Sequence, residues 1–277
     1  MTWNTYSLAR RFAVLPALVL AVTAIVAGPT LAQAPPEDDY WPGIRSELYD
    51  QRPIAEEDGK VTLEAPVRAE DAAVVPITMR IPADIAADAK TLRLIIEKNP
   101  MPVAATFTFG PAAGNGERVI STRVRVDMYS NVRAVLETND GGLHMATRFV
   151  KAAGGCSAPA LKDSEEALAQ LGKMKLRLHS VDQSPIMQQA QVMIRHPNYS
   201  GMQMNQLTGL YIPAKYVERM EVKRGNDIVF TMTGGISLSE NPNIRFTYGR
   251  GANNEITVTA QDADGKVFTV RQSPTGS

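Results

Sequence analysis

Short runs of apolar and β-branched residues, separated by turn-forming residues, dominate the chain from residue 60 onward. Several runs alternate apolar and polar positions strictly, as residues 121–128 do, and such alternation places one side of a strand in a core and the other in water. Proline, glycine, asparagine and aspartate separate the runs, which is typical of antiparallel strands joined by tight turns. The first-half strands are expected at residues 61–63, 74–81, 92–97, 104–109, 119–129, 132–138 and 143–150.

The second half repeats this pattern after a short interruption. Residues 139–142 (NDGG), 225–227 (GND) and 264–265 (DG) each lie between two runs, and these turn sequences favour hairpins because tight turns need positive φ. The pattern therefore predicts an all-β protein made of two immunoglobulin-like β-sandwich domains in tandem. The second-half strands are expected at residues 174–179, 191–195, 217–223, 228–233, 236–238, 243–248, 256–260 and 267–271.

Two short helices are expected outside the strands. Trp41, Ile44, Leu48 and Tyr49 recur at three- and four-residue intervals, which indicates an amphipathic helix leading into the first domain. Residues 163–166 (DSEE) resemble a capping box, so a second helix is expected there, in the linker between the domains, ending near Gly172.

The N-terminus has the order of a secretory signal peptide. Arg10 and Arg11 precede an apolar run at residues 12–27, and the small residues Ala32 and Ala34 follow. We expect cleavage after Ala32 and export to the periplasm by the Sec route or, given the two arginines, the twin-arginine route.

The expected organisation follows from these patterns. No apolar stretch after the signal peptide is long enough to span a membrane, so no membrane span is expected in the mature chain. The predicted boundaries are a signal peptide at 1–32, an N-terminal extension with a short helix at 33–59, a first sandwich at 60–156, a linker at 157–172 and a second sandwich at 173–277.

Composition excludes several classes of function. The chain has 29 basic and 29 acidic residues, so it has no electrostatic footprint for nucleic acid. No ligand spacing typical of a zinc or calcium site is present, so no metal or cofactor is expected. The histidines, His144, His179 and His196, are far apart in sequence, and no catalytic residues are expected.

Cys156 is the only cysteine among 277 residues, and it follows Gly154 and Gly155 directly after the last strand of the first half. A lone cysteine cannot close an intrachain disulfide, so it serves in reactivity, in a bond to another molecule, or in ordinary packing. The flanking glycines favour a flexible arm with an exposed thiol over a buried position. A second unusual segment, His196, Pro197, Asn198 and Tyr199, is expected to be a partner-facing loop because it is dense in turn-forming and aromatic residues.

Residues 150–156 (VKAAGGC) and 194–197 (IRHP) carry a family resemblance. Residues from about 41 to 156, including 63–66 (LEAP) and 122–125 (TRVR), resemble the Y subunit of the sulfur-oxidation carrier SoxYZ. Residues from about 174 to 268, including 239–246 (SENPNIRF), resemble the Z subunit. In this combination the chain is similar to the fused, quinoprotein dehydrogenase-associated SoxYZ-like carriers.

The resemblance implies that Cys156 is a carrier thiol that holds sulfur intermediates, of thiosulfate type, while separate enzymes act on them. It implies no catalytic centre in the chain itself. Its expected partners are periplasmic redox enzymes, either Sox-type c-type cytochromes or a quinoprotein dehydrogenase system. The alternative is a non-covalent accessory module for a periplasmic quinoprotein alcohol dehydrogenase, in which the cysteine is incidental. A third possibility is an intermolecular disulfide dimer through the odd cysteine.

Overall fold

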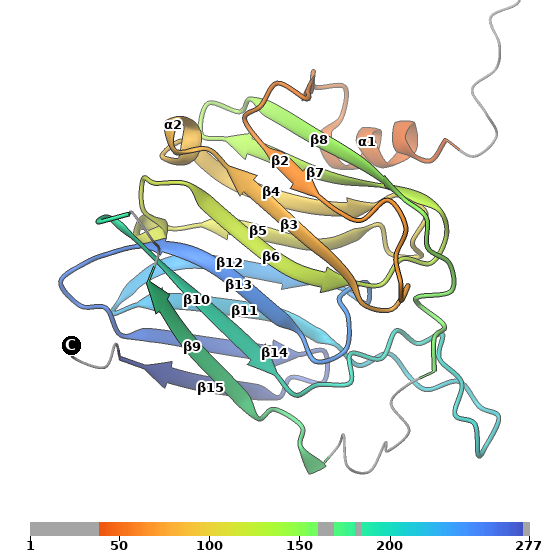
Figure 1. The fold of residues 1–277 in the computed structure, drawn as a ribbon. Coiled ribbons are helices and arrows are strands. Elements are labelled where there is room, and N and C mark those ends of the chain that lie inside the picture. Colours follow the sequence, from red (N-terminus) through yellow and green to blue (C-terminus); the bar gives the residue numbers. More distant parts are fainter. Residues whose placement is uncertain (1–38, 160–168, 181–183, 274–277) are drawn as a thin grey trace, which may run out of the picture. The chain divides into compact units, whose positions relative to one another are not determined.

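Two β-sheets face each other and contain strands from both halves of the chain (Figure 1). The computed structural model describes residues 39–159, 169–180 and 184–273. One sheet has nine strands in the order β1-β8-β7-β4-β5-β12-β11-β14-β15. The other has six strands in the order β2-β3-β6-β13-β10-β9.

The first half contributes α1 and strands β1 to β8, which form one sandwich. Its elements are α1 (Trp41–Tyr49), β1 (Ala55–Glu56), β2 (Thr62–Glu64), β3 (Val75–Ile81), α2 (Ala83–Ala86), β4 (Ala89–Ile96), β5 (Val103–Phe109), a 3-10 turn η1 (Pro111–Ala113), β6 (Arg118–Val124), β7 (Ser130–Thr138) and β8 (Leu143–Val150).

The second half contributes strands β9 to β15, which form the other sandwich. Its elements are β9 (Met174–Ser180), β10 (Met187–Ile194), β11 (Val217–Arg224), β12 (Asp227–Gly234), β13 (Asn243–Gly249), β14 (Ile256–Asp262) and β15 (Val267–Gln272).

The two sandwiches are joined edge to edge through both sheets. In the nine-stranded sheet β5 pairs antiparallel with β12, with Phe109 opposite Phe230 and Ala105 opposite Gly234. In the six-stranded sheet β6 pairs with β13 at Ser121 and Ile120. Each half thereby covers strand edges that would otherwise leave backbone N–H and C=O groups unpaired.

An aromatic cluster lies at this junction. Phe107 of β5 and Phe230 of β12 make an edge-to-face contact, with ring centroids 5.6 Å apart. Phe230 makes a second such contact with Phe246 of β13, at 5.0 Å, and so connects the two sheets. Such pairs contribute about 0.5–1.5 kcal/mol each beyond the area they bury. The same hydrophobic core contains buried residues from both halves.

Helix α1 packs on the outer face of the nine-stranded sheet. Its buried residues, Trp41 and Tyr49, lie against Ile95, Val135 and Met145 in a second, smaller apolar cluster. This arrangement follows from the spacing of the apolar positions along the helix, which puts them on one side.

The structure confirms the predicted fold class, with two immunoglobulin-like sandwiches in tandem and little helix. The helix at Trp41–Tyr49 and the three hairpin turns are also confirmed, and Gly141, Gly225 and Gly265 have the positive φ that such turns require. Residues 236–238 were wrongly predicted as a strand, since there only Leu238 makes an isolated bridge, to Val124.

Some predictions remain untested. The signal peptide at 1–32 and most of the linker helix lie outside the described residues. The domain boundaries stay predictions. Strands of the two halves pair with each other, β5 with β12 and β6 with β13. No helix among the described residues is both long and apolar enough to cross a membrane.

Candidate functional site

The segment that carries Cys156 leaves the sheet at the end of β8 and is pinned to the connection between β6 and β7. Lys151 forms a parallel bridge with Arg68. Beyond it, the amide of Gly154 donates to the carbonyl of Asp127 (2.8 Å) and that of Gly155 to the carbonyl of Val126 (3.1 Å). We call residues 154–158 the thiol loop. It is held by backbone hydrogen bonds, so the prediction of a flexible arm is wrong for this structure.

Glycine is favoured at the two positions of the thiol loop for different structural reasons. Gly154 has φ +77°, which glycine adopts without strain, and a Cβ placed on it would meet nothing closer than the Ser157 hydroxyl at 3.9 Å. Gly155 lies against backbone, and a Cβ placed on it would be 2.1 Å from the carbonyl oxygen of Ala72 and 2.6 Å from that of Val126. Glycine is therefore needed at position 155 so that the loop can approach its neighbours closely.

Cys156 is fully buried, with 0% of its surface exposed. The expectation of an exposed thiol is therefore wrong. Two residues of the second half bind the segment around it: the Ser200 hydroxyl donates to the carbonyl of Cys156, and the side-chain amide of Gln203 donates to the carbonyl of Ala158 (2.9 Å). Both belong to the connection between β10 and β11, which we call the covering loop (residues 195–216).

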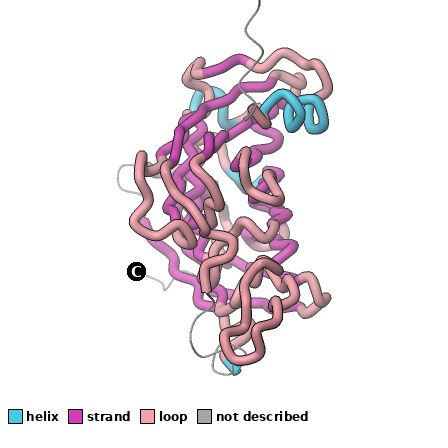
Figure 2. The backbone as a smooth tube through the Cα atoms, turned by 90° about the vertical axis from the view of Figure 1, so that its right-hand side faces the viewer, coloured by secondary structure: helices cyan, strands magenta, loops and turns pink. Residues whose placement is uncertain are grey.

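The covering loop runs past the thiol loop at one end of the sheets. Figure 1 shows it in cyan, close to the green segment that follows β8, and Figure 2 shows the connections gathered on this side. The hydrogen bonds from Ser200 and Gln203 establish that the two loops touch. Cys156 thus lies where the first half meets the second.

Burial controls the chemistry of the thiol. Removal from water raises the pKa of Cys156 to about 12, the carboxylate of Asp127 adds to the rise, and the guanidinium of Arg125 opposes it. The Asp127 carboxylate also accepts a hydrogen bond from the Cys156 amide (3.2 Å). Because the thiolate is the nucleophile, the closed site holds its sulfur in the unreactive, protonated form at neutral pH.

Arg125 connects the two loops. Its guanidinium donates to the carbonyl of Gly155 (3.2 Å) and to that of Asn198 in the covering loop (3.4 Å). Desolvation lowers its pKa, whereas Glu240, Cys156 and Asp71 act to raise it. The buried guanidinium therefore holds the two loops together. If one loop moved away, its carbonyl would lose the hydrogen bond from Arg125.

Sequence reasoning missed Arg125. The alternation of residues 121–128 placed it on the water-facing side, but β6 ends at Val124 and the alternation no longer applies beyond it. The signal available was its position one residue past the strand end, as the last residue of the family-like sequence TRVR (122–125).

The segment from His196 to Tyr199 was predicted to face a partner, and this prediction is wrong because all four residues are buried. Asn198, at φ +46°, has a structural role: its side chain donates to the carbonyl of Leu238 (3.2 Å) and accepts from the amide of Val217 (3.1 Å). The segment therefore anchors the covering loop to the second sandwich.

His196 is buried beside a carboxylate. Its Nδ1 accepts a hydrogen bond from the Asn198 amide (3.1 Å), and its Nε2 lies 3.6 Å from Oδ2 of Asp262. Burial lowers the pKa of His196, and the interaction with Asp262 only partly opposes this effect. The imidazole is therefore neutral at neutral pH and acts in packing and capping of the loop.

The other histidines lie elsewhere. His144 on β8 contacts Asp58, with 2.6 Å between Nδ1 and Oδ2, and His179 lies on β9. Among the described residues, no histidine forms a hydrogen bond with the thiol loop, so no hydrogen-bonded pair of Cys156 with a histidine is seen there. The part of the chain that is described also contains no group of three or more histidine, cysteine or acidic side chains placed to hold a metal.

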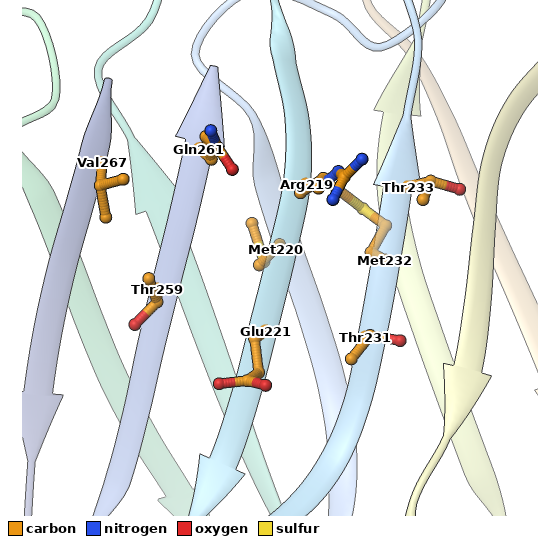
Figure 3. A pocket seen from close by; sticks show the side chains of 9 residues that line it. All are labelled: Arg219, Met220, Glu221, Thr231, Met232, Thr233, Thr259, Gln261 and Val267. Carbon is orange, nitrogen blue, oxygen red and sulfur yellow. The ribbon is translucent and has the colours of Figure 1, made fainter. Parts of the chain in front are cut away.

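A hollow of about 380 Å³ lies on the outer face of the second sandwich, across β11, β12, β14 and β15 (Figure 3). Polar side chains such as Arg219, Glu221, Thr231 and Gln261 line it. None of the predicted site residues takes part in it, so it is separate from the chemistry of Cys156.

Comparisons with known protein families find one match in each half of the chain. The family model of the sulfur oxidation protein SoxY matches residues 45–156, and that of the sulphur oxidation protein SoxZ matches residues 178–273. The SoxY match ends at Cys156. A search of curated protein sequences finds no match.

Among solved structures, the chain is similar to the sulfur carrier protein SoxY from Chlorobium limicola f thiosulfatophilum. The two are 26% identical, and the match covers 40% of this chain and 94% of the other, with a TM-score of 0.34. The two family matches follow one another and together cover most of the chain. The chain therefore belongs to the SoxYZ-like sulfur carriers, as a SoxY-type half fused to a SoxZ-type half.

Proposed function

We propose that this protein is a periplasmic carrier that holds a thiosulfate-type sulfur intermediate covalently on Cys156 while separate redox enzymes act on it. The observation that carries the proposal is the position of the sole cysteine. It ends the SoxY-type half, and polar residues of the SoxZ-type half donate hydrogen bonds to its carbonyl and to that of Ala158. The signal-like sequence at residues 1–32 supports export to the periplasm.

Attachment needs an electron acceptor. When the thiol sulfur of Cys156 bonds to the outer sulfur of thiosulfate, the thiol proton and two electrons leave, so the electrons must pass to a redox partner. The carrier itself supplies the sulfur atom and its surroundings. This chemistry agrees with a protein of the sulfur-oxidation family that works with other enzymes.

The carrier must open to be loaded. In the closed form the thiol is buried and protonated, so neither thiosulfate nor an enzyme reaches it. Release of the hydrogen bonds from Ser200, Gln203 and Arg125 would separate the thiol loop from the covering loop. The two neutral bonds are worth about 1 kcal/mol each and the guanidinium bond about 1.5–3 kcal/mol, so this separation costs roughly 4 kcal/mol and lies within reach of partner binding.

Intact-mass measurement tests the proposal. Protein taken from the periplasm of its native cells, grown with thiosulfate, should carry a sulfur-containing adduct that is absent from Cys156→Ser. An unmodified mass under every sulfur supply would overturn the covalent role.

A second function is favoured by one specific observation. The buried thiol is also what a non-covalent accessory module for a periplasmic quinoprotein dehydrogenase would show, with the cysteine as a packing residue. Under that function Cys156→Ser leaves dehydrogenase activity in cells unchanged and no adduct is found. An intermolecular disulfide remains a third prediction, and it too requires the loop to open; non-reducing gels test it.

A further inference from the structure

The outer end of the covering loop exposes a cluster of large apolar side chains. Met204, Leu207, Leu210 and Tyr211 all lie exposed within eight residues, and 96% of the Leu207 surface is accessible. We call residues 204–211 the apolar tip. Single exposed apolar residues are ordinary on protein surfaces, but a cluster marks an interaction site.

The apolar tip has a defined backbone. Met204 and Tyr211 form an antiparallel bridge, and the amide of Asn205 donates to the carbonyl of Leu210 (2.9 Å). At the turn, the Asn205 side chain accepts from the amides of Leu207 (2.9 Å) and Thr208 (3.2 Å). A preorganised turn loses little conformational entropy when it binds, so its side chains are suited to serve as anchors.

The tip and the thiol loop are connected through the base of the same covering loop. Ser200 and Gln203 hold the carbonyls of Cys156 and Ala158, and the side chain of Gln203 also accepts from the amide of Ser200 (3.2 Å). Gln203 is adjacent in sequence to Met204, where the tip begins. The tip therefore follows directly in the chain on the residues that hold the thiol loop.

The sequence of the covering loop indicates the chemistry of the partner. Residues 197–214 include no Asp, Glu, Lys or Arg. Contact through this stretch therefore relies on apolar burial, with little steering by charge.

We propose that the apolar tip docks into an apolar cleft on the redox enzyme that loads Cys156. The inference rests on the proposed carrier function. It adds that the SoxZ-type half provides the recognition element, whereas the SoxY-type half provides the thiol.

The first experiment measures loading in native cells. The triple variant Leu207→Ser, Leu210→Ser and Tyr211→Ser should lower the fraction of protein carrying the Cys156 adduct at least tenfold. Val267→Ser, which changes an exposed apolar residue of the outer sheet face, should leave it unchanged. Iodoacetamide should modify the purified triple variant at the same rate as the wild-type protein. Equal rates would show that the thiol loop still closes in the variant.

The outcomes separate the two proposals. An unloaded wild-type protein overturns the carrier function, whereas a loaded wild type with an equally loaded triple variant overturns docking alone. A photo-crosslinker placed at position 207 in the full chain should capture a redox enzyme in native cells, with a yield that does not fall as salt is raised. Capture of a second copy, or a yield that collapses with salt, contradicts the docking proposal.

Discussion

Gly155→Ala is expected to open the thiol loop. The new Cβ would lie 2.1 Å from the carbonyl oxygen of Ala72, and both atoms that it meets first, that oxygen and the one on Val126, belong to backbone. Neither can rotate away as a side chain could, so the thiol loop itself must move. Movement breaks the bond from the Gly155 amide to Val126 and the bond from Arg125 to the Gly155 carbonyl.

The size of the effect follows from those two bonds. A neutral hydrogen bond is worth about 1 kcal/mol and one to a charged group about 1.5–3 kcal/mol, so the closed loop loses roughly 3 kcal/mol. At about 1.4 kcal/mol per tenfold, the open fraction rises about 100-fold.

The assay is the rate of iodoacetamide modification of the native protein at neutral pH, followed by intact mass. Gly154→Ala is the matched control, since its Cβ would meet nothing closer than the Ser157 hydroxyl at 3.9 Å. It bears only the cost of φ +77°, about 1–2 kcal/mol, and should accelerate modification less than Gly155→Ala does. Equal rates for wild type and a folded Gly155→Ala, or equal acceleration by both variants, would refute the close-approach argument.

Three further predictions concern stability. The lowered pKa of His196 keeps the folded imidazole neutral while the unfolded one gains a proton below pH 6.5, so stability should fall with decreasing pH by at most about 1.4 kcal/mol per pH unit. His196→Gln should flatten this slope in urea titrations at several pH values, and an unchanged slope would exclude His196 as the cause. The raised pKa of Cys156 acts at the other end, because above pH 9.0 the unfolded thiol loses its proton and the folded one does not. Wild type should therefore lose stability between pH 9 and pH 10, below the ordinary tyrosine pKa of 10.0, more steeply than Cys156→Ala. Phe230→Ala should cost about 3–5 kcal/mol and shift the midpoint of both Trp41 fluorescence and circular dichroism, because Phe230 packs on both sheets at the junction. A Trp41 transition that stays in place would show that the halves unfold separately.

The sequence determined most of the strands, the hairpin turns and the helix at Trp41–Tyr49, because these depend on local periodicity and on residues with fixed φ preferences. It also singled out Cys156, since that residue is unique in the chain.

Only the tertiary structure decided what surrounds the thiol. Ser200 and Gln203 lie more than 40 residues away in sequence, and strand pairing between the two halves brings them onto the thiol loop. The same glycines that favour an exposed arm also permit close backbone packing, and local sequence does not distinguish the two uses. Burial of Cys156, Arg125 and Asn198 arises from contacts between segments distant in sequence, which no periodicity within one segment encodes.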